Sequence, residues 1–243
     1  MSRTSRNKEC LSKRASSFLG YGDPSSAKVW FVGLEDSVPF TTLDELHHVP
    51  VVQYLAGTEC KTSRSSVYNI MSKIIVALRG AHDVTEWRKY RDEELFMLGG
   101  DAFLVNLYPL GKPVEDSWPT QYRRWLGMSR KKYYCNVQSG KIPRFLFLRQ
   151  QQRQYKAPLT ICFGKNHWPH FAGCFGLDGR DCCEEGRYRF YPASRFVMTE
   201  FFRSTRMSDV CIDEVVRIIN EMSLNPFKRS GNKTPSDASS RLQ

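Results

Sequence analysis

The sequence predicts an α/β fold with three α/β/α layers around a central, mostly parallel sheet of four strands. Short apolar runs alternate with segments of helical periodicity, a pattern typical of strands joined by crossover helices. The runs are apolar throughout rather than at every second position, so we expect both faces of each strand to be buried. A chain of 243 residues fits one domain of about 200 residues with short tails.

The four expected strands are short apolar runs, each followed by residues that interrupt the run. They occupy 28–33 (KVWFVG), 102–107 (AFLVNL), 159–163 (LTICF) and 195–199 (RFVMT). The first run ends in glycine, the third is followed by Gly164, and Tyr108-Pro109 stops the second.

Helical spacing of apolar residues predicts the elements between these runs. The clearest stripe lies in 65–79, and a last helix follows Ser208, whose side chain can cap it. Weaker patterns predict helices around 84–97, 119–127 and 143–155, and a short helix after Gly164.

Residues 25–223 are predicted to form one domain, with disordered basic tails at 1–24 and 224–243. Within 1–14 and 226–243, nine Lys and Arg residues stand against only two acids. Segments so rich in Ser, Lys, Arg and Pro bury too little apolar surface to fold on their own.

No apolar run approaches the ~18 residues that a membrane-spanning helix needs, and the N-terminus lacks the apolar stretch of a signal peptide. We therefore expect a cytoplasmic, monomeric protein with no membrane partner. The eight cysteines are scattered, so reduced and mostly buried thiols are expected. Cys174, Cys182 and Cys183, downstream of His167 and His170, are spaced too loosely for a typical metal site, and no metal or cofactor is predicted.

The positive charge is concentrated inside the chain as well as in its tails. The net charge is +11, and the span 117–177 contains eleven basic residues and no acid, with aromatic residues interleaved. A long stretch of one sign is best tolerated where a polyanion supplies the countercharge, which favours nucleic acid over an anionic membrane surface or a plain basic surface. The predicted DNA contacts within this span are Arg123, Arg124, Arg130, Lys131, Lys132 and Lys165.

Polar or otherwise unusual residues lie at the ends of all four expected strands, where parallel strands present functional side chains. After the first strand come Glu35, Asp36 and Ser37, and the second contains Asn106. Lys165, Asn166 and His167 follow the third strand. The loop after the fourth strand carries Phe201, Arg203, Arg206 and Met207.

These segments resemble the uracil-DNA glycosylase superfamily over roughly residues 28–220. In that family a strand leads into a Gly-x-Asp/Asn-Pro loop that handles the attacking water, and KVWFVGLEDS is similar, with Gly33 and Glu35 in place. AFLVNLYP resembles the strand whose Asn, here Asn106, binds the flipped base. ICFGKN resembles the third strand, and FVMTEFFRSTRMS the loop that enters DNA beside the flipped nucleotide.

Three positions depart from the family pattern. Asp36 replaces the proline, and Phe201 stands where the family has the His that stabilises the leaving base. Ser37 occupies the position of an aromatic residue that blocks substituents at the pyrimidine 5-position. The resemblance therefore implies a pocket open to 5-substituted pyrimidines.

The residue chemistry agrees with base excision. Cleaving an N-glycosidic bond passes through an oxocarbenium-like state, which the carboxylate of Glu35 could stabilise while orienting water. The base must leave the stack, so an amide such as Asn106 and a stacking aromatic such as Phe40 or Tyr108 are needed. Alternatives remain for several residues: a solvated loop pair for Glu35 and Asp36, core packing for Phe40 and Tyr108, helix capping for Asn166 and His167, and surface charge for Arg203 and Arg206.

The sequence therefore predicts a glycosylase acting on double-stranded DNA and leaving an abasic site. Its expected substrate is a 5-substituted pyrimidine, such as (glucosyl-)hydroxymethylcytosine in phage DNA, which suggests antiviral defence. The alternatives are a non-catalytic nucleic-acid-binding module of the same fold, a uracil-excision repair enzyme, or an unrelated α/β enzyme. The chain has neither a G-x-x-x-x-G-K-[ST] loop nor a G-x-G-x-x-G turn, which counts against common phosphate-binding designs.

Overall fold

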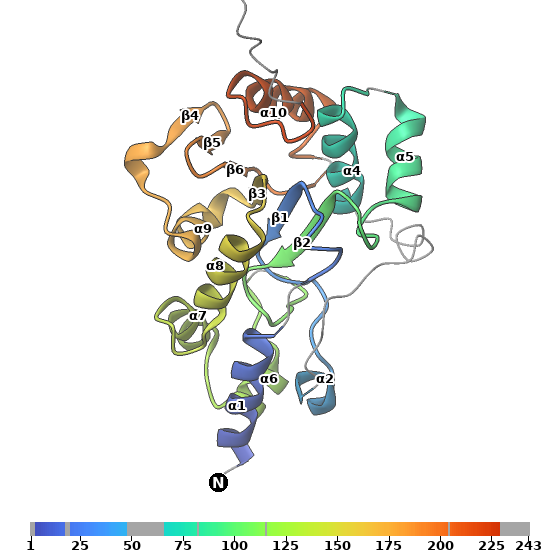
Figure 1. Cartoon of the computed structure of the whole chain (residues 1–243). Helices are drawn as coiled ribbons and strands as arrows, with labels where there is room; N and C mark the ends of the chain where they lie inside the picture. Colours follow the sequence, from blue (N-terminus) through green and yellow to red (C-terminus); the bar gives the residue numbers. More distant parts are fainter. Residues whose placement is uncertain are drawn as a thin grey trace, which may run out of the picture.

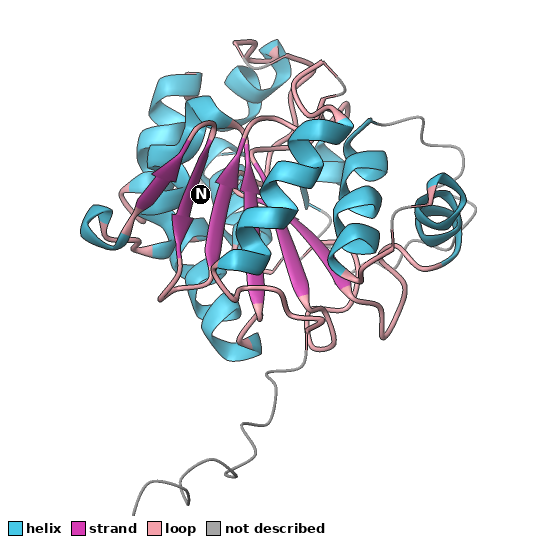
Figure 2. Cartoon of the chain, turned by 90° about the horizontal axis from the view of Figure 1, so that it is seen from above, coloured by secondary structure: helices cyan, strands magenta, loops and turns pink. Residues whose placement is uncertain are grey.

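A computed structural model describes residues 3–17, 20–47, 66–81, 83–114, 116–203 and 205–228. One mixed sheet of six strands runs through the domain in the order β2-β1-β3-β6-β5-β4. Helices cover both faces of this sheet (Figure 2). The expected α/β architecture with a layer of helices on each side is therefore confirmed.

The four predicted strands form the parallel part of the sheet. They are β1 (Val29–Gly33), β2 (Ala102–Asn106), β3 (Leu159–Phe163) and β6 (Phe196–Thr199). Alternate residues of β1 enter opposite cores, Trp30 and Val32 on one side and Val29 and Phe31 on the other. Because both faces of each strand are buried, the strands are apolar throughout. This is why they could be predicted from continuous apolar runs in the sequence.

The predicted count of four strands is wrong, because a hairpin extends the sheet. Strands β4 (Cys183–Glu185) and β5 (Tyr188–Tyr191) pair with each other antiparallel, and β5 pairs antiparallel with β6. The hairpin sequence CEEGRYRFY is interrupted by charged residues, because β4 is the exposed edge and Arg189 in β5 is half-buried. An edge strand of this kind lacks the apolar run that identified the others.

One helical layer follows the prediction closely. It contains α4 (Ser66–Leu78), α5 (Val84–Glu93) and α10 (Asp209–Glu221). The Ser208 hydroxyl accepts a hydrogen bond from the backbone N–H of Cys211, which confirms the expected N-cap.

The other layer contains both predicted and unpredicted helices. The helices α6 (Thr120–Leu126), α8 (Arg144–Tyr155) and α9 (Trp168–Phe175) were expected, whereas α1 (Arg3–Ala15) and α7 (Arg130–Gln138) were not. A short helix, α2 (Leu43–His47), packs against α1, and 3-10 turns cover Lys165–His167 and Gly179–Asp181. The helix α7 buries only Tyr133 and Val137, too few apolar residues to stand out in the sequence.

The predicted disorder of residues 1–24 is wrong for most of that segment. The helix α1 packs one narrow stripe, Asn7, Leu11 and Ala15, against the domain, at spacings of four residues. The Asn7 amide donates to the carbonyl of Trp125 at 2.9 Å. The helix could not be predicted from its sequence, because it has only two apolar residues on its buried stripe and contains five basic residues.

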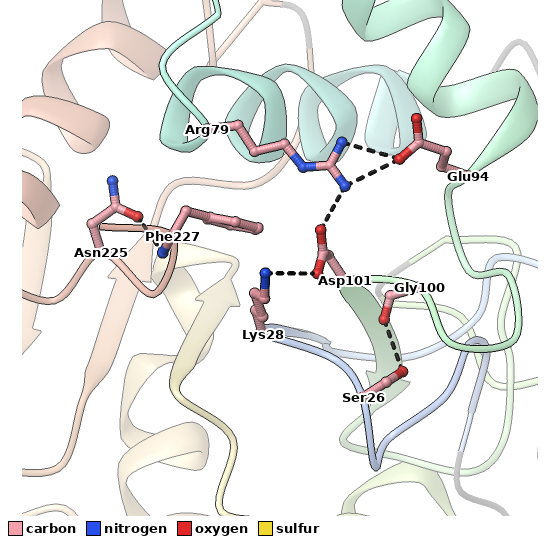
Figure 3. Close-up of polar contacts among 8 residues, drawn as sticks. All are labelled: Ser26, Lys28, Arg79, Glu94, Gly100, Asp101, Asn225 and Phe227. Carbon is pink, nitrogen blue, oxygen red and sulfur yellow. Dashed lines mark hydrogen bonds and ion pairs between the residues drawn. The ribbon is translucent and has the colours of Figure 1, made fainter. Parts of the chain in front are cut away.

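The predicted tail from residue 224 also begins too early. Leu224 and Asn225 are buried, and the Asn225 amide donates to the carbonyl of Leu78 at 2.9 Å. The Phe227 ring lies 4.7 Å from the Lys28 ammonium, beside the ion pairs that Asp101 makes with Arg79 and Lys28 at 2.5 and 3.4 Å (Figure 3). These contacts fasten the chain to the amino-terminal ends of β1 and β2. The remaining predicted tail, 229–243, lies outside the described residues.

Candidate active site

The strand order reverses beside β1, because the chain passes from β1 to β2 on one side and places β3 on the other. Such a switch point opens a crevice at the carboxyl ends of the strands, where α/β proteins commonly bind ligands. A cavity of about 400 Å³ lies there. Its lining includes residues from four strand ends, Glu35, Asp36, Ser37, Asn106, Phe163 and Phe201. The topology therefore brings together the two predicted catalytic residues, Glu35 and Asn106.

Gly33 and Asn106 are paired in register at the ends of β1 and β2. A Cβ atom on Gly33 would lie 2.7 Å from Asn106 Oδ1 and 2.8 Å from Phe163 Cζ, so only glycine leaves room for this amide. The Asn106 carbonyl accepts hydrogen bonds from Arg144 at 3.2 and 2.6 Å. Within the described residues its side-chain amide has no hydrogen-bond partner, so the amide is available to a ligand in the cavity.

Glu35 is held by two donors that the sequence interpretation missed. Its Oε1 lies 2.8 Å from the ammonium of Lys112, and its Oε2 accepts a hydrogen bond from the Tyr134 hydroxyl at 3.1 Å. The Lys112 ammonium also donates to the Tyr134 hydroxyl at 2.7 Å. The side chains of Glu35 and Lys112 are only 7% and 0% exposed, so water screens this pair little. Burial and the negative charge of Glu35 raise the pKa of Tyr134, which keeps this phenol a neutral donor.

A second cavity of about 600 Å³ adjoins the first and shares Tyr21, Asp36, Val38 and Asn106 with it. Phe40 and Tyr108 also line it. Arg14 of α1 enters this cavity, where its guanidinium lies 4.3 Å from the centre of the Phe40 ring. The first helix thus contributes a side chain to the site, although its sequence predicts a disordered basic tail.

Tyr108 lines the second cavity but exposes little of its surface there. Its side chain is buried, its ring lies 4.4 Å from that of Tyr134, and its hydroxyl lies 3.1 Å from His170 Nδ1. Gln138 donates a second hydrogen bond to the same hydroxyl at 3.2 Å. The main role of Tyr108 is therefore to support the wall of aromatic rings next to Glu35.

We expect stability to fall below neutral pH because of His170. Burial, followed by the nearby His167, lowers the pKa of His170 in the folded protein below its ordinary 6.5. The unfolded chain then binds a proton more readily than the folded protein. The free energy of unfolding is therefore highest above about pH 6.5 and decreases as the pH falls toward the folded-state pKa of His170. Thermal unfolding between pH 5 and 7.5 measures this. The His170→Gln variant should show a shallower decline in Tm than the wild type, and an identical decline would contradict the assignment.

The residues of the loop after β6 differ in their exposure to solvent. Phe201 is 47% exposed at the mouth of the first cavity, whereas Phe202 is buried and stacks on Phe163 with ring centres 4.4 Å apart. Arg203 and Arg206 are exposed, as a DNA contact requires. Met207 is 2% exposed, so its prediction as a DNA-binding residue is wrong. It precedes the N-cap of α10, a position whose apolar side chain commonly packs back onto the helix.

Asn166 and His167 lie in the 3-10 turn after β3. Neither belongs to the lining of the two cavities. Lys165, in the same turn, is half-exposed and lies 3.6 Å from the carboxylate of Glu200.

The basic span divides into a surface part and a structural part. Arg123, Arg124, Lys131 and Lys132 are exposed on α6 and α7, and Arg130 pairs with Asp116 at 2.8 Å. These helices lie at the end of the molecule toward which β1 and β2 point (Figure 1). Arg144 is instead buried, and burial lowers its pKa to about 10. It binds backbone carbonyls, so not every cation of this span can face DNA.

The described ranges contain no metal-binding cluster, no disulfide and no membrane-spanning helix. No group of three or more His, Cys, Asp or Glu residues there has a geometry that could hold a metal ion. The seven cysteines that the structure describes are free thiols, and Cys60 lies outside the described residues. No described helix is both long and apolar enough to cross a membrane.

Comparison of the chain with protein-family models, with curated proteins and with solved structures gave no match.

Proposed function

We propose that this chain is a DNA glycosylase that hydrolyses an N-glycosidic bond and leaves an abasic site. The observation that carries the proposal is the first cavity, at the switch point of the sheet. A buried carboxylate, an amide without a hydrogen-bond partner among the described residues, and two exposed polar side chains meet there. The cavity forms between strand ends, and exposed cations of α6 and α7 lie toward the same end of the molecule.

Each group has a role in such a reaction. Glu35 supplies a fixed negative charge for the oxocarbenium-like sugar of the transition state. The Asn106 amide can donate to and accept from the polar edge of an extruded base. Phe201, half-exposed at the mouth, offers a ring on which that base can stack.

The proposed substrate class is a 5-substituted pyrimidine, up to (glucosyl-)hydroxymethylcytosine as found in phage DNA. Two features support it: Ser37 is small and exposed at the first cavity, and the adjoining cavity of about 600 Å³ provides space beyond an unsubstituted base. Acting on such bases would make the protein part of antiviral defence. A uracil-excision repair enzyme is the alternative if small bases are preferred.

One assay tests the reaction and separates the alternatives. Matched duplexes carry uracil, cytosine, 5-hydroxymethylcytosine or its glucosylated form at one position, and abasic sites are counted by alkaline cleavage. Cleavage at the modified cytosines supports the proposal, and preference for uracil supports repair. Binding without cleavage of any duplex would support the second candidate, a non-catalytic nucleic-acid-binding module. The phenylalanine at position 201, where the family has a histidine, is the observation that favours this candidate.

We expect DNA affinity to fall steeply with salt, because each neutralised phosphate contributes about −0.9 to the slope of log K against log [salt]. Replacing Lys131 and Lys132 by alanine should reduce the steepness of that slope by about 2. Replacing Arg88 and Lys89, which are exposed on α5 in the opposite layer, is the matched control. Fluorescence anisotropy over a salt series measures both. Equal slopes for the two double variants would remove α7 from the DNA interface.

We expect Ser37→Tyr to reduce excision of glucosylated hydroxymethylcytosine at least tenfold, because a ring at the first cavity would clash with a 5-substituent. Any activity on unsubstituted pyrimidines should remain. Single-turnover rates on matched duplexes make the comparison, with Ser37→Ala as the control for loss of the hydroxyl. If Ser37→Tyr processes the bulky base at the wild-type rate, position 37 does not face the 5-position.

A further inference from the structure

Two adjacent carboxylates, Glu35 and Asp36, lie in opposite surroundings at the first cavity. Glu35 is buried, with Lys112 on one oxygen and the Tyr134 hydroxyl on the other. Asp36 is exposed and lines both cavities. Neighbouring acids in such different environments commonly divide the acid, base and electrostatic roles of one reaction.

The partners of Glu35 suit it to a fixed charge and not to proton transfer. An ammonium ion 2.8 Å away and a phenol donor at 3.1 Å both stabilise the ionised carboxylate. Taking up a proton would leave the ammonium of Lys112 buried beside a neutral group, which is costly. Glu35 therefore remains an anion throughout the reaction and is a poor acceptor for a proton from water.

Asp36 is positioned by the backbone and keeps one oxygen available. Its Oδ1 accepts a hydrogen bond from the backbone N–H of Val38 at 3.2 Å, and its backbone carbonyl accepts one from the backbone N–H of Lys112 at 2.8 Å. Across the described residues, no hydrogen bond reaches Asp36 Oδ2. Gly111 lets the loop approach this closely, because a Cβ atom there would lie 2.0 Å from the Val38 carbonyl oxygen.

We infer that Asp36 is the general base for the attacking water, and that Glu35 acts only through its charge. This inference rests on the proposed base excision. The water oxygen forms a bond to the sugar C1′, the C1′–N bond breaks, and its electron pair leaves with the base. The water gives one proton to the Asp36 carboxylate, and the departing base takes a proton from solvent. Glu35 and Lys112 stay ionised before and after the step.

Chemical rescue of the full-length protein tests this division. Asp36→Ala should lose at least 100-fold in single-turnover excision, and formate should restore it at least tenfold by replacing the missing base. Azide, which needs no deprotonation, should attack C1′ of the Asp36→Ala complex and give a 1-azido sugar. Glu35→Gln should lose activity that neither anion restores, because its site is closed by Lys112 and Tyr134.

Asp213→Ala, which removes an exposed carboxylate from α10, is the control for surface charge. Circular dichroism and DNA binding confirm that each variant is folded. Asp36→Ala activity within threefold of wild type, or rescue of Glu35→Gln in its place, would overturn the assignment while leaving base excision intact. A wild-type protein that excises none of the tested bases would overturn the proposed function and this inference together.

Discussion

Replacing Lys112 by methionine is expected to lower the free energy of unfolding by about 3–5 kcal/mol, the usual cost of leaving one member of a buried ion pair unpaired. The Lys112 and Glu35 side chains are almost fully excluded from solvent, so water cannot solvate the carboxylate that remains. Methionine keeps the approximate length of the side chain, which separates the loss of charge from the creation of a cavity.

Denaturant unfolding followed by fluorescence measures this change. The double variant Lys112→Met with Glu35→Gln should recover much of the loss, because no unpaired charge is then buried. Lys131→Met, at an exposed position of α7, is the matched control and should change stability by less than about 0.5 kcal/mol. A Lys112→Met protein as stable as this control would show that the pair is open to solvent.

Glu35→Gln and Asn106→Ala are each expected to reduce base excision 100-fold or more, the order of magnitude for removing a preorganised polar group from an active site. Glutamine preserves the shape of Glu35 and removes its charge. Alanine at position 106 removes an amide that has no hydrogen-bond partner within the described part of the chain, and it keeps the backbone carbonyl bound by Arg144. The Asn106→Ala protein should therefore remain close to wild type in stability.

Single-turnover formation of abasic sites measures both effects, with DNA binding as the check on folding. Asn166→Ala is a matched control, because Asn166 lies outside the lining of both cavities and is exposed. A wild-type rate for either Glu35→Gln or Asn106→Ala would remove that residue from the catalytic site.

The parallel strands could be predicted because burial on both faces demands continuous apolar runs, and the run at Leu159–Phe163 was placed without error. The hairpin of β4 and β5 could not, because the exposed edge strand β4 tolerates charged residues such as Glu184. The helix α1 was missed for a related reason. Two buried apolar side chains, Leu11 and Ala15, are enough to dock a helix onto an existing core but too few to reveal it.

The candidate site was partly predictable by the same logic. Parallel strands end at one edge, so Glu35 and Asn106 were expected to meet, and both line the first cavity. Their supporting contacts come from far along the chain: Tyr134, which donates to Glu35, lies 99 residues away. No local pattern reports such a contact. The one available signal was Lys112 itself, a lone charge in the mostly apolar stretch after β2.

The buried guanidinium of Arg144 links the first helix to the end of β2, where Asn106 lies. Its nitrogens donate to the carbonyl of Ala15 at the end of α1 and to the carbonyl of Asn106 at the end of β2. Proteolysis that released α1 would deprive this cation of an acceptor in the protein interior, a loss of roughly 1–3 kcal/mol. It would also remove Arg14 from the second cavity. Helix α1 therefore supports the candidate site from outside the sheet, through the Ala15 carbonyl and the Arg14 side chain.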